Sequence, residues 1–170
     1  MKGYVHLYTG NGKGKTTAAF GLALRAACAG KRVYIGQFVK SMKYNEVAME
    51  ELFDKVVIEQ YGQGCTLNRE LDPGDKDKAE LGFEKVSEIL QSGDYDLVIL
   101  DEVTIALYFK LLTHEQVIQA IQARAAHVEV VMTGRYAPQA LVDFADLVTE
   151  MKEVKHYYKM GVLSRDGIDR

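Results

Sequence analysis

The sequence predicts an α/β fold in which a mostly parallel sheet of about six strands lies between two layers of helices. Short apolar runs alternate along the chain with alanine-rich or amphipathic stretches, and glycines or prolines separate most of them. This alternation indicates right-handed βαβ crossovers, which place successive strands parallel and cover both faces of the sheet. The length adds a third observation: 170 residues without a linker, repeat or low-complexity tract predict a single domain, 1–170.

Composition excludes several classes of protein. Hydrophobic residues make up 48% and charged residues 26% of the chain, as in soluble globular proteins, and no apolar run is long enough to span a membrane. A net charge of −3 argues against a broad nucleic-acid surface. The start, MKGYVHLYTG, lacks a hydrophobic signal core, and Cys28 and Cys65 form no disulfide or metal-ligand pattern. We therefore expect a cytoplasmic protein with a small ligand and with no membrane or nucleic-acid partner.

The first predicted strand, residues 4–8, runs into a glycine-rich loop, TGNGKG, and then into an alanine-rich helix, residues 15–29. The glycines allow backbone amides to converge on a ligand, and the helix adds the positive end of its dipole. Lys15 would then reach the β and γ phosphates of a nucleotide, and Thr16 would offer its hydroxyl to Mg²⁺. The match to the Walker A pattern G-x-x-x-x-G-K-[ST] is incomplete because Thr9 holds the first glycine position. A plain glycine-rich turn is the alternative, but the order strand, loop, helix favours a polyphosphate site.

The second predicted strand brings two polar side chains to the same edge of the sheet. Residues 33–39, VYIGQFV, form this strand, and Lys40 follows it. Because ligands of parallel sheets bind beyond the carboxyl ends of the strands, Gln37 and Lys40 are site candidates. A solvated strand end is an equally good interpretation of both. Residues 44–54 then predict a short amphipathic helix, and residues 56–61 a third strand.

A break in the pattern follows the third strand. Residues 62–77, GQGCTLNRELDPGDKD, combine glycines, a proline and mixed polarity, which predicts a long loop. Long ordered loops in compact domains are often functional. Asp75 or Asp77 is the expected cap of the next helix, which stops at Gly93. The apolar face of that helix repeats at helical spacing through Ala79, Phe83, Val86 and Leu90.

The most apolar predicted strand ends in an acidic pair. Residues 95–101, YDLVILD, predict a buried strand that closes in Asp101 and Glu102. Together with an upstream Walker A loop, this matches the Walker B arrangement, in which the aspartate holds Mg²⁺ directly or through water. A plain strand terminus that bears charges is the alternative. Glu102 would either activate a water molecule or orient the ligand or metal, and the sequence leaves that choice open.

The last third of the chain repeats the alternation of helix and strand. Thr113, with a glutamine three residues later, predicts a helix start, and Pro138 fits the first turn of another helix. Residues 129–133 and 147–151 predict two further strands. Arg135 follows the first of them, so in a parallel sheet it lies on the same rim as the glycine-rich loop and the acidic pair. An arginine there can bind a phosphate or carboxylate through two hydrogen bonds.

Several motifs in order carry a resemblance to a known family: TGNGKGKTT, GQFVK, NRE, LDE, TGR-x-AP and VKH. Together they resemble the bacterial P-loop corrinoid adenosyltransferases over nearly the whole chain. The same loop occurs in that family, so Thr9 becomes part of its signature. The resemblance implies a P-loop NTPase-like three-layer sandwich. It also implies transfer of the 5′-deoxyadenosyl group of ATP to the Co(I) of a reduced corrinoid, with release of triphosphate, in adenosylcobalamin biosynthesis or salvage.

The resemblance also implies roles for individual residues. Cobalt is the nucleophile, so the expected catalytic side chains assist rather than attack: Lys15, Thr16, Glu102 and Arg135. Mg²⁺ would be held by Thr16 and Asp101. The triphosphate would be bound by Gly10, Asn11, Gly12, Lys13, Gly14, Lys15, Thr16 and Thr17. Motif positions near the substrates, not assigned to one ligand each, are Gln37, Lys40, Asn68, Arg69, Glu70 and Arg135. Lys155 and His156 match more weakly, and a solvated chain end is their alternative.

One stretch departs from the family pattern. Family members carry aromatic residues before NRE that displace the lower cobalt ligand, whereas residues 62–67, GQGCTL, contain none. Cys65 or Leu67 is open for that role, although a packed thiol is the more common use of a cysteine. The resemblance further implies a homodimer and a reduced flavoprotein as electron donor.

Two other functions remain as alternatives at this point. One is an ordinary P-loop ATPase or small-molecule kinase that cleaves at the γ phosphate. The other is a non-enzymatic, nucleotide-dependent corrinoid carrier. GTPases and ABC-type ATPases are disfavoured because the sequence contains no NKxD-like or LSGGQ-like motif.

Overall fold

The computed structural model describes residues 2–40, 42, 44–62 and 72–169. A six-stranded sheet forms its centre, in the order β3-β2-β4-β5-β1-β6, and every neighbouring pair is parallel. The strands are β1 (Val5–Thr9), β2 (Val33–Phe38), β3 (Val56–Tyr61), β4 (Leu97–Asp101), β5 (Glu129–Thr133) and β6 (Leu147–Glu150). The predicted α/β class is therefore confirmed, and the sheet is parallel throughout.

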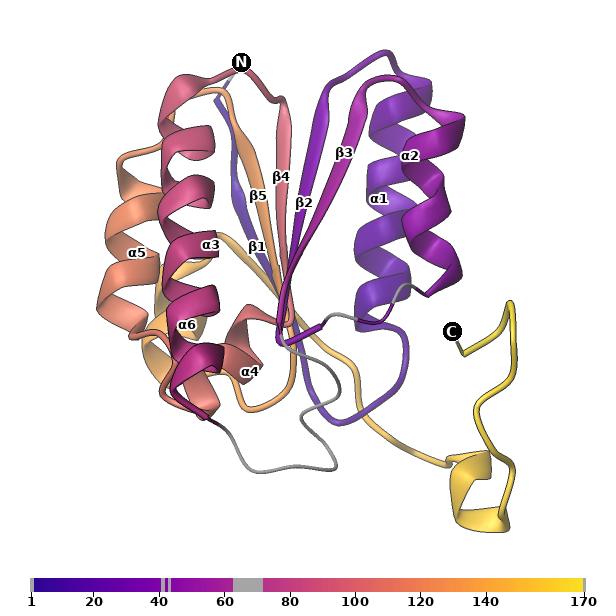
Figure 1. The fold of residues 1–170 in the computed structure, drawn as a ribbon. Helices are drawn as coiled ribbons and strands as arrows, with labels where there is room; N and C mark the ends of the chain where they lie inside the picture. Colours follow the sequence, from indigo (N-terminus) through magenta and orange to yellow (C-terminus); the bar gives the residue numbers. More distant parts are fainter. Residues whose placement is uncertain (1, 41, 43, 63–71, 170) are drawn as a thin grey trace.

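Helices cover both faces of the sheet, as a three-layer sandwich requires (Figure 1). On one face lie α1 (Lys15–Cys28) and α2 (Met49–Leu52), the latter preceded by a 3₁₀ turn, η1 (Asn45–Ala48). The other face carries α3 (Pro73–Ser92), α4 (Val103–Tyr108), α5 (His114–Gln122) and α6 (Gln139–Phe144). Each face has its own buried apolar cluster, and strand β4 is buried along its whole length between them. Central strands of this kind read as continuous apolar runs because both of their faces are covered.

Helix α3 starts earlier than the sequence predicts. Its N-cap is Asp72, whose side chain accepts a hydrogen bond from the Gly74 amide at 2.8 Å. Asp75 is the third helical residue and returns the contact by accepting from the Asp72 amide at 2.9 Å. The prediction that Asp75 or Asp77 caps the helix was therefore wrong. Pro73 explains the shift, because its fixed φ and missing N–H suit the first helical position.

The helices differ from the sequence analysis at three further places, one of which is a helix that was not predicted. The segment predicted as one helix over residues 44–54 is divided into the 3₁₀ turn η1 and the single turn α2. Pro138 is the N-cap of α6 rather than a residue of its first turn. Helix α4 was not predicted, because its sequence, VTIALY, starts with three β-branched residues of low helix propensity. Val103, Thr104 and Ala106 are buried, so tertiary packing rather than intrinsic propensity stabilises this helix.

Candidate active site

The glycine-rich loop between β1 and α1 has the geometry of a phosphate-binding loop. Gly14 caps α1 with φ 116°, a conformation that favours glycine. The Gly12 amide donates to the Met151 carbonyl at 2.6 Å, and a Cβ at Gly12 would stand 2.6 Å from the same oxygen. Lys15 is buried and donates to the Gly12 carbonyl at 2.7 Å, so its ammonium lies inside the loop. Burial lowers the pKa of Lys15, against the attraction of Glu102.

Asp101, at the end of β4, is the polar centre of the site. Its carboxylate is fully buried. One oxygen, Oδ1, accepts from the hydroxyls of Thr16 at 2.8 Å and Thr133 at 2.7 Å. The other, Oδ2, accepts from Lys40 Nζ at 2.9 Å and Gln37 Nε2 at 3.0 Å. Burial alone would raise the pKa of Asp101, but the Lys40 charge and these hydrogen bonds outweigh it and hold the pKa below its ordinary value. The carboxylate therefore stays ionised.

Neither Gln37 nor Lys40 lies at a solvated strand end. Gln37 is fully buried, and its Oε1 accepts a hydrogen bond from Gln60 Nε2 at 2.9 Å. The Lys40 side chain is 18% exposed and forms an ion pair with Asp101. Val39 stands between the strand end and Lys40 with φ 57°, a rare conformation for a β-branched residue. The structure thus brings both predicted residues to Asp101, while a direct role in ligand binding stays a prediction.

Thr133 joins the two acidic residues and was missed by the sequence analysis. Its hydroxyl donates to Asp101 and accepts from the Glu102 amide at 3.0 Å. The contact exists because β5 lies between β4 and β1, so the last residue of β5 reaches the carboxylate at the end of β4. Its position as the final strand residue before Gly134 and Arg135 was the signal in the sequence that could have identified Thr133.

Glu102 sits on a strained turn beside the lysine of the loop. Its backbone has φ 59°, in the left-handed region that non-glycine residues seldom adopt. Burial raises the pKa of Glu102, and the neighbouring Asp101 charge raises it further, while Lys40, Lys15 and Arg135 oppose the shift. Glu102 therefore takes up a proton more easily than an exposed glutamate.

A cavity of about 1200 Å³ connects these groups to an apolar, aromatic wall. Its polar end is lined by Gly12 through Thr17, Lys40, Glu102 and Arg135. Its other walls come from α1, from η1 and α2, from α4, and from residues 156–169. At its rim Tyr108 and Tyr136 stack with ring centroids 4.4 Å apart, and both are more than half exposed. One end of a single cavity is thus lined by many of the residues predicted from sequence.

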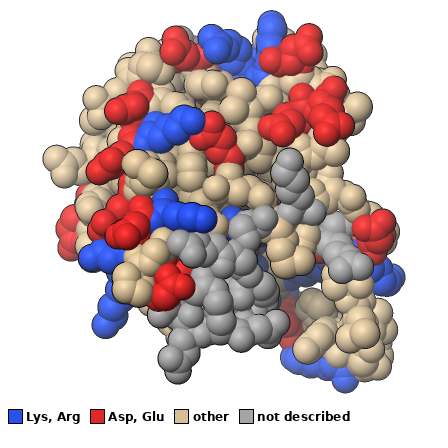
Figure 2. Space-filling model, viewed as in Figure 1, with Lys and Arg blue, Asp and Glu red and all other residues tan. Residues whose placement is uncertain are grey.

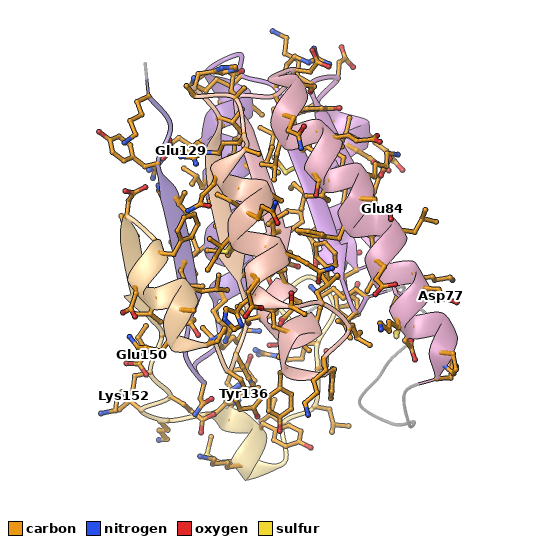
Figure 3. All side chains as sticks on the ribbon, turned by 90° about the vertical axis from the view of Figure 1, so that its left-hand side faces the viewer. Asp77, Glu84, Glu129, Tyr136, Glu150 and Lys152 are labelled. Carbon is orange, nitrogen blue, oxygen red and sulfur yellow. The ribbon has the colours of Figure 1, made fainter. Side chains whose placement is uncertain are left out.

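Some predicted residues lie elsewhere. Asn11 lines a smaller neighbouring cavity of about 600 Å³, shared with Arg135, Tyr136 and Lys152. Figure 3 shows Tyr136 and Lys152 in the lower part of the molecule and Glu129, at the start of β5, in the upper part. Gly10 packs against Met151, and Lys155 is exposed. His156 lines the large cavity and accepts from the Tyr158 amide at 3.1 Å. The predictions for Cys65, Leu67, Asn68, Arg69 and Glu70 lie outside the described residues.

Comparison with known proteins identifies the family of this chain. A family described as "ATP:corrinoid adenosyltransferase BtuR/CobO/CobP" matches residues 1–169. The chain belongs to this family. The description of the family names ATP and a corrinoid as the substrates of an adenosyl transfer.

Individual relatives agree with the family. The corrinoid adenosyltransferase of Pseudomonas aeruginosa is 37% identical, with 99% of this chain and 84% of the relative covered. The corrinoid adenosyltransferases of Salmonella typhimurium and Escherichia coli are 35% and 33% identical, each with 99% of this chain and 86% of the relative covered. The protein is therefore an ATP:corrinoid adenosyltransferase, as the sequence motifs predicted, and an ordinary ATPase, a kinase or a non-enzymatic carrier is not favoured.

In Figure 2, acidic and basic side chains are interspersed over the visible face, which shows no extended basic patch. None of the helices in the described part of the chain is long and apolar enough to cross a membrane.

Proposed function

We propose that the glycine-rich loop holds the triphosphate of ATP as a leaving group, while the corrinoid occupies the apolar part of the same cavity. The supporting observation is the continuity of the 1200 Å³ cavity from Lys15 to the aromatic rim at Tyr108 and Tyr136. Pockets for one drug-sized ligand measure roughly 300–1,000 Å³, so this one has room for a nucleotide and part of a second, bulky substrate.

In this proposal the protein stabilises the negative charge of the departing triphosphate. When cobalt attacks C5′, the C5′–O bond breaks and its electron pair goes to the departing triphosphate. The loop, Lys15 and Arg135 line the same end of the cavity, where they would stabilise that charge. Lys15 would exchange the Gly12 carbonyl for a phosphate oxygen. Glu102 lines the same cavity and is influenced by the charges of Lys15 and Arg135, so it would orient the lysine and the nucleotide.

The residues around Asp101 fit a magnesium ion. Mg²⁺ prefers oxygen ligands and usually keeps several waters, with one or two carboxylates and substrate phosphates completing its coordination. The Thr16 hydroxyl and Asp101 Oδ1 are two such oxygens, 2.8 Å apart at the edge of the loop. Oδ1 accepts from Thr16 and Thr133, whereas Lys40 and Gln37 engage Oδ2, so only Oδ1 is in contact with the loop threonine. We propose that Thr16 and Asp101 hold Mg²⁺, which would neutralise part of the triphosphate charge when bound.

The wider setting rests on the family resemblance. A homodimer, a reduced flavoprotein that delivers the electron for Co(I), and a cytoplasmic location are part of the proposal. Direct contacts of Asn68, Arg69 and Glu70 with the substrates belong to it as well.

The decisive experiment separates alkyl transfer from hydrolysis. The protein is mixed with ATP, Mg²⁺ and a chemically reduced corrinoid, and the products are separated. We expect a light-sensitive adenosylcorrinoid and triphosphate in equal amounts. ADP and phosphate without a cobalt–carbon bond would overturn the proposal.

Lys15→Ala tests the role of the loop. Removal of one preorganised charge-stabilising donor typically lowers a rate by about 10²–10³-fold, so we expect a loss of at least about 100-fold in transfer rate. The matched control is Lys78→Ala, which removes an exposed lysine from α3 and should leave the rate unchanged. A Lys15→Ala rate equal to that of the control would contradict the assignment of the loop.

A further inference from the structure

The segment after β6 returns across the active-site edge of the sheet. Residues 151–169, named here the C-terminal strap, pass below the sheet, form the 3₁₀ turn η3 (Tyr157–Met160) and end near the lower end of α2 (yellow in Figure 1). The strap provides one wall of the large cavity through Tyr157, Val162, Ile168 and Asp169. A nucleotide bound to the loop would therefore lie between the body of the protein and the strap.

One carboxylate joins the strap to the phosphate-binding loop. Lys13 donates to Asp169, 156 positions away in the sequence, and to the Ile168 carbonyl at 3.2 Å. The Asp169 side chain is only 11% exposed. It also accepts from the Tyr157 hydroxyl and from Arg165 Nε at 3.1 Å. The hydrogen bonds from Lys13 and Tyr157 lower the pKa of Asp169, so the carboxylate is ionised at neutral pH.

The rest of the strap is loosely packed. Leu163, Met160 and Ile168 are 74%, 66% and 61% exposed, so apolar burial holds this segment weakly. At its start the Met151 carbonyl accepts from the loop amide of Gly12. A second side-chain contact joins Asn45 of η1 to Asp166, at 2.9 Å on the exposed surface. The position of the far end of the strap therefore depends strongly on polar contacts. Among them, the contact of Asp169 with Lys13 is made to the glycine-rich loop itself.

We propose that Asp169 is a positioning residue for ATP: by holding Lys13 it fastens the C-terminal strap across the cavity and slows the release of the bound nucleotide. The inference rests on the function proposed above. Two physical effects contribute. The Lys13 ammonium is ordered before the phosphates arrive, so its side-chain entropy is already lost. Asp169 also lies between Lys13 and Arg165, so its negative charge is balanced and does not repel the triphosphate.

Nucleotide release without any corrinoid tests the proposal. A fluorescent ATP analogue with Mg²⁺ is bound and then displaced by excess ATP in a stopped-flow instrument. We expect Asp169→Asn to raise the release rate by about threefold to fivefold, the upper part of the range for one partly exposed ion pair. The matched control is Asp166→Asn, the same chemical change in the same segment, whose amide oxygen still accepts from Asn45. It should release the analogue at the wild-type rate.

A double-mutant cycle shows whether the effect passes through Lys13. In a Lys13→Met background, Asp169→Asn should have no further effect on release, because the contact is already absent. Asp169→Glu keeps the carboxylate, so this variant should release the analogue at close to the wild-type rate. Amide exchange of residues 157–169 should be faster in Asp169→Asn, with exchange in β4 unchanged, which also shows that the variant is folded.

The outcomes separate the two proposals. If Asp169→Asn releases the analogue at the wild-type rate, the positioning role is overturned while the nucleotide site stands. The same holds if Asp169→Asn changes the release rate equally in the wild type and in the Lys13→Met background. A wild-type protein that fails to bind the analogue overturns the nucleotide site itself, and the positioning role with it. In a third outcome, the analogue binds and Asp169→Asn releases it faster, but no adenosyl transfer occurs. This result would refute the proposed chemistry alone.

Discussion

Replacing Lys40 by methionine removes the cation from the buried pair with Asp101 and keeps a side chain of similar length. Asp101 is fully buried, and Lys40 Nζ lies 2.9 Å from its Oδ2. Loss of one partner of a buried pair typically costs about 3–5 kcal/mol, because the other charge is left buried without compensation. Three neutral donors remain on the carboxylate, and the lysine side chain is 18% exposed. We therefore expect Lys40→Met to lower the free energy of unfolding by about 3 kcal/mol at pH 7.5.

The loss should depend on pH with a defined sign. In the wild type the pKa of Asp101 is lowered in the folded state, so its contribution to stability is present above the pKa of the unfolded chain and is lost only as the pH falls through the lower, folded value. Without Lys40, burial dominates and the folded pKa of Asp101 rises above the unfolded value. The ionised carboxylate is then penalised at neutral pH, and protonation relieves the penalty. The difference between the two proteins should therefore shrink from pH 7.5 to pH 5.

Urea unfolding at both pH values measures these quantities. With a slope of about 2 kcal/mol per molar urea, a loss of about 3 kcal/mol lowers the midpoint by about 1.5 M. The control is Lys55→Met, which removes an exposed lysine whose Nζ donates to the Gly30 carbonyl at 2.9 Å. Its loss should stay below about 1 kcal/mol at both pH values. Equal losses for the two variants, or a Lys40→Met loss that is the same at pH 5 and pH 7.5, would refute the reasoning.

Three further substitutions test local packing by the same unfolding measurement. Gly134→Ala should cost about 3 kcal/mol, because Gly134 has φ 135° and its Cβ would stand 2.2 Å from Thr104 Oγ1; a cost below 1 kcal/mol would contradict this. Gly82→Ala would place a Cβ 2.3 Å from the Tyr61 ring, so we expect a net loss of about 1–2 kcal/mol despite the better helix propensity of alanine, and a gain in stability would disprove the contact. Asp72→Ala removes the cap of α3 and should cost about 1 kcal/mol, whereas no loss would show that the cap adds nothing.

Local sequence patterns were sufficient for most of the fold. Strand β5 (Glu129–Thr133) has the predicted bounds, and β2 (Val33–Phe38) differs from its prediction by one residue. Both were predictable because a strand covered on two faces is a continuous apolar run, which needs no knowledge of its neighbours. Helix α4 was unpredictable for the opposite reason. Its β-branched start disfavours a helix in isolation, and the buried faces of Val103 and Ala106 stabilise it only after the sheet has formed.

The sequence by itself determined the glycine-rich loop, the acidic pair and the family, because each depends on residues close together in the chain. Only the tertiary structure decided the surroundings of those residues. Thr133 reaches Asp101 because β5 lies between β4 and β1, and no local pattern states the order of strands. Lys13 meets Asp169 because the strap returns beneath the sheet after β6. Contacts between such distant positions follow from how the helices and strands pack, and packing is a property of the whole chain.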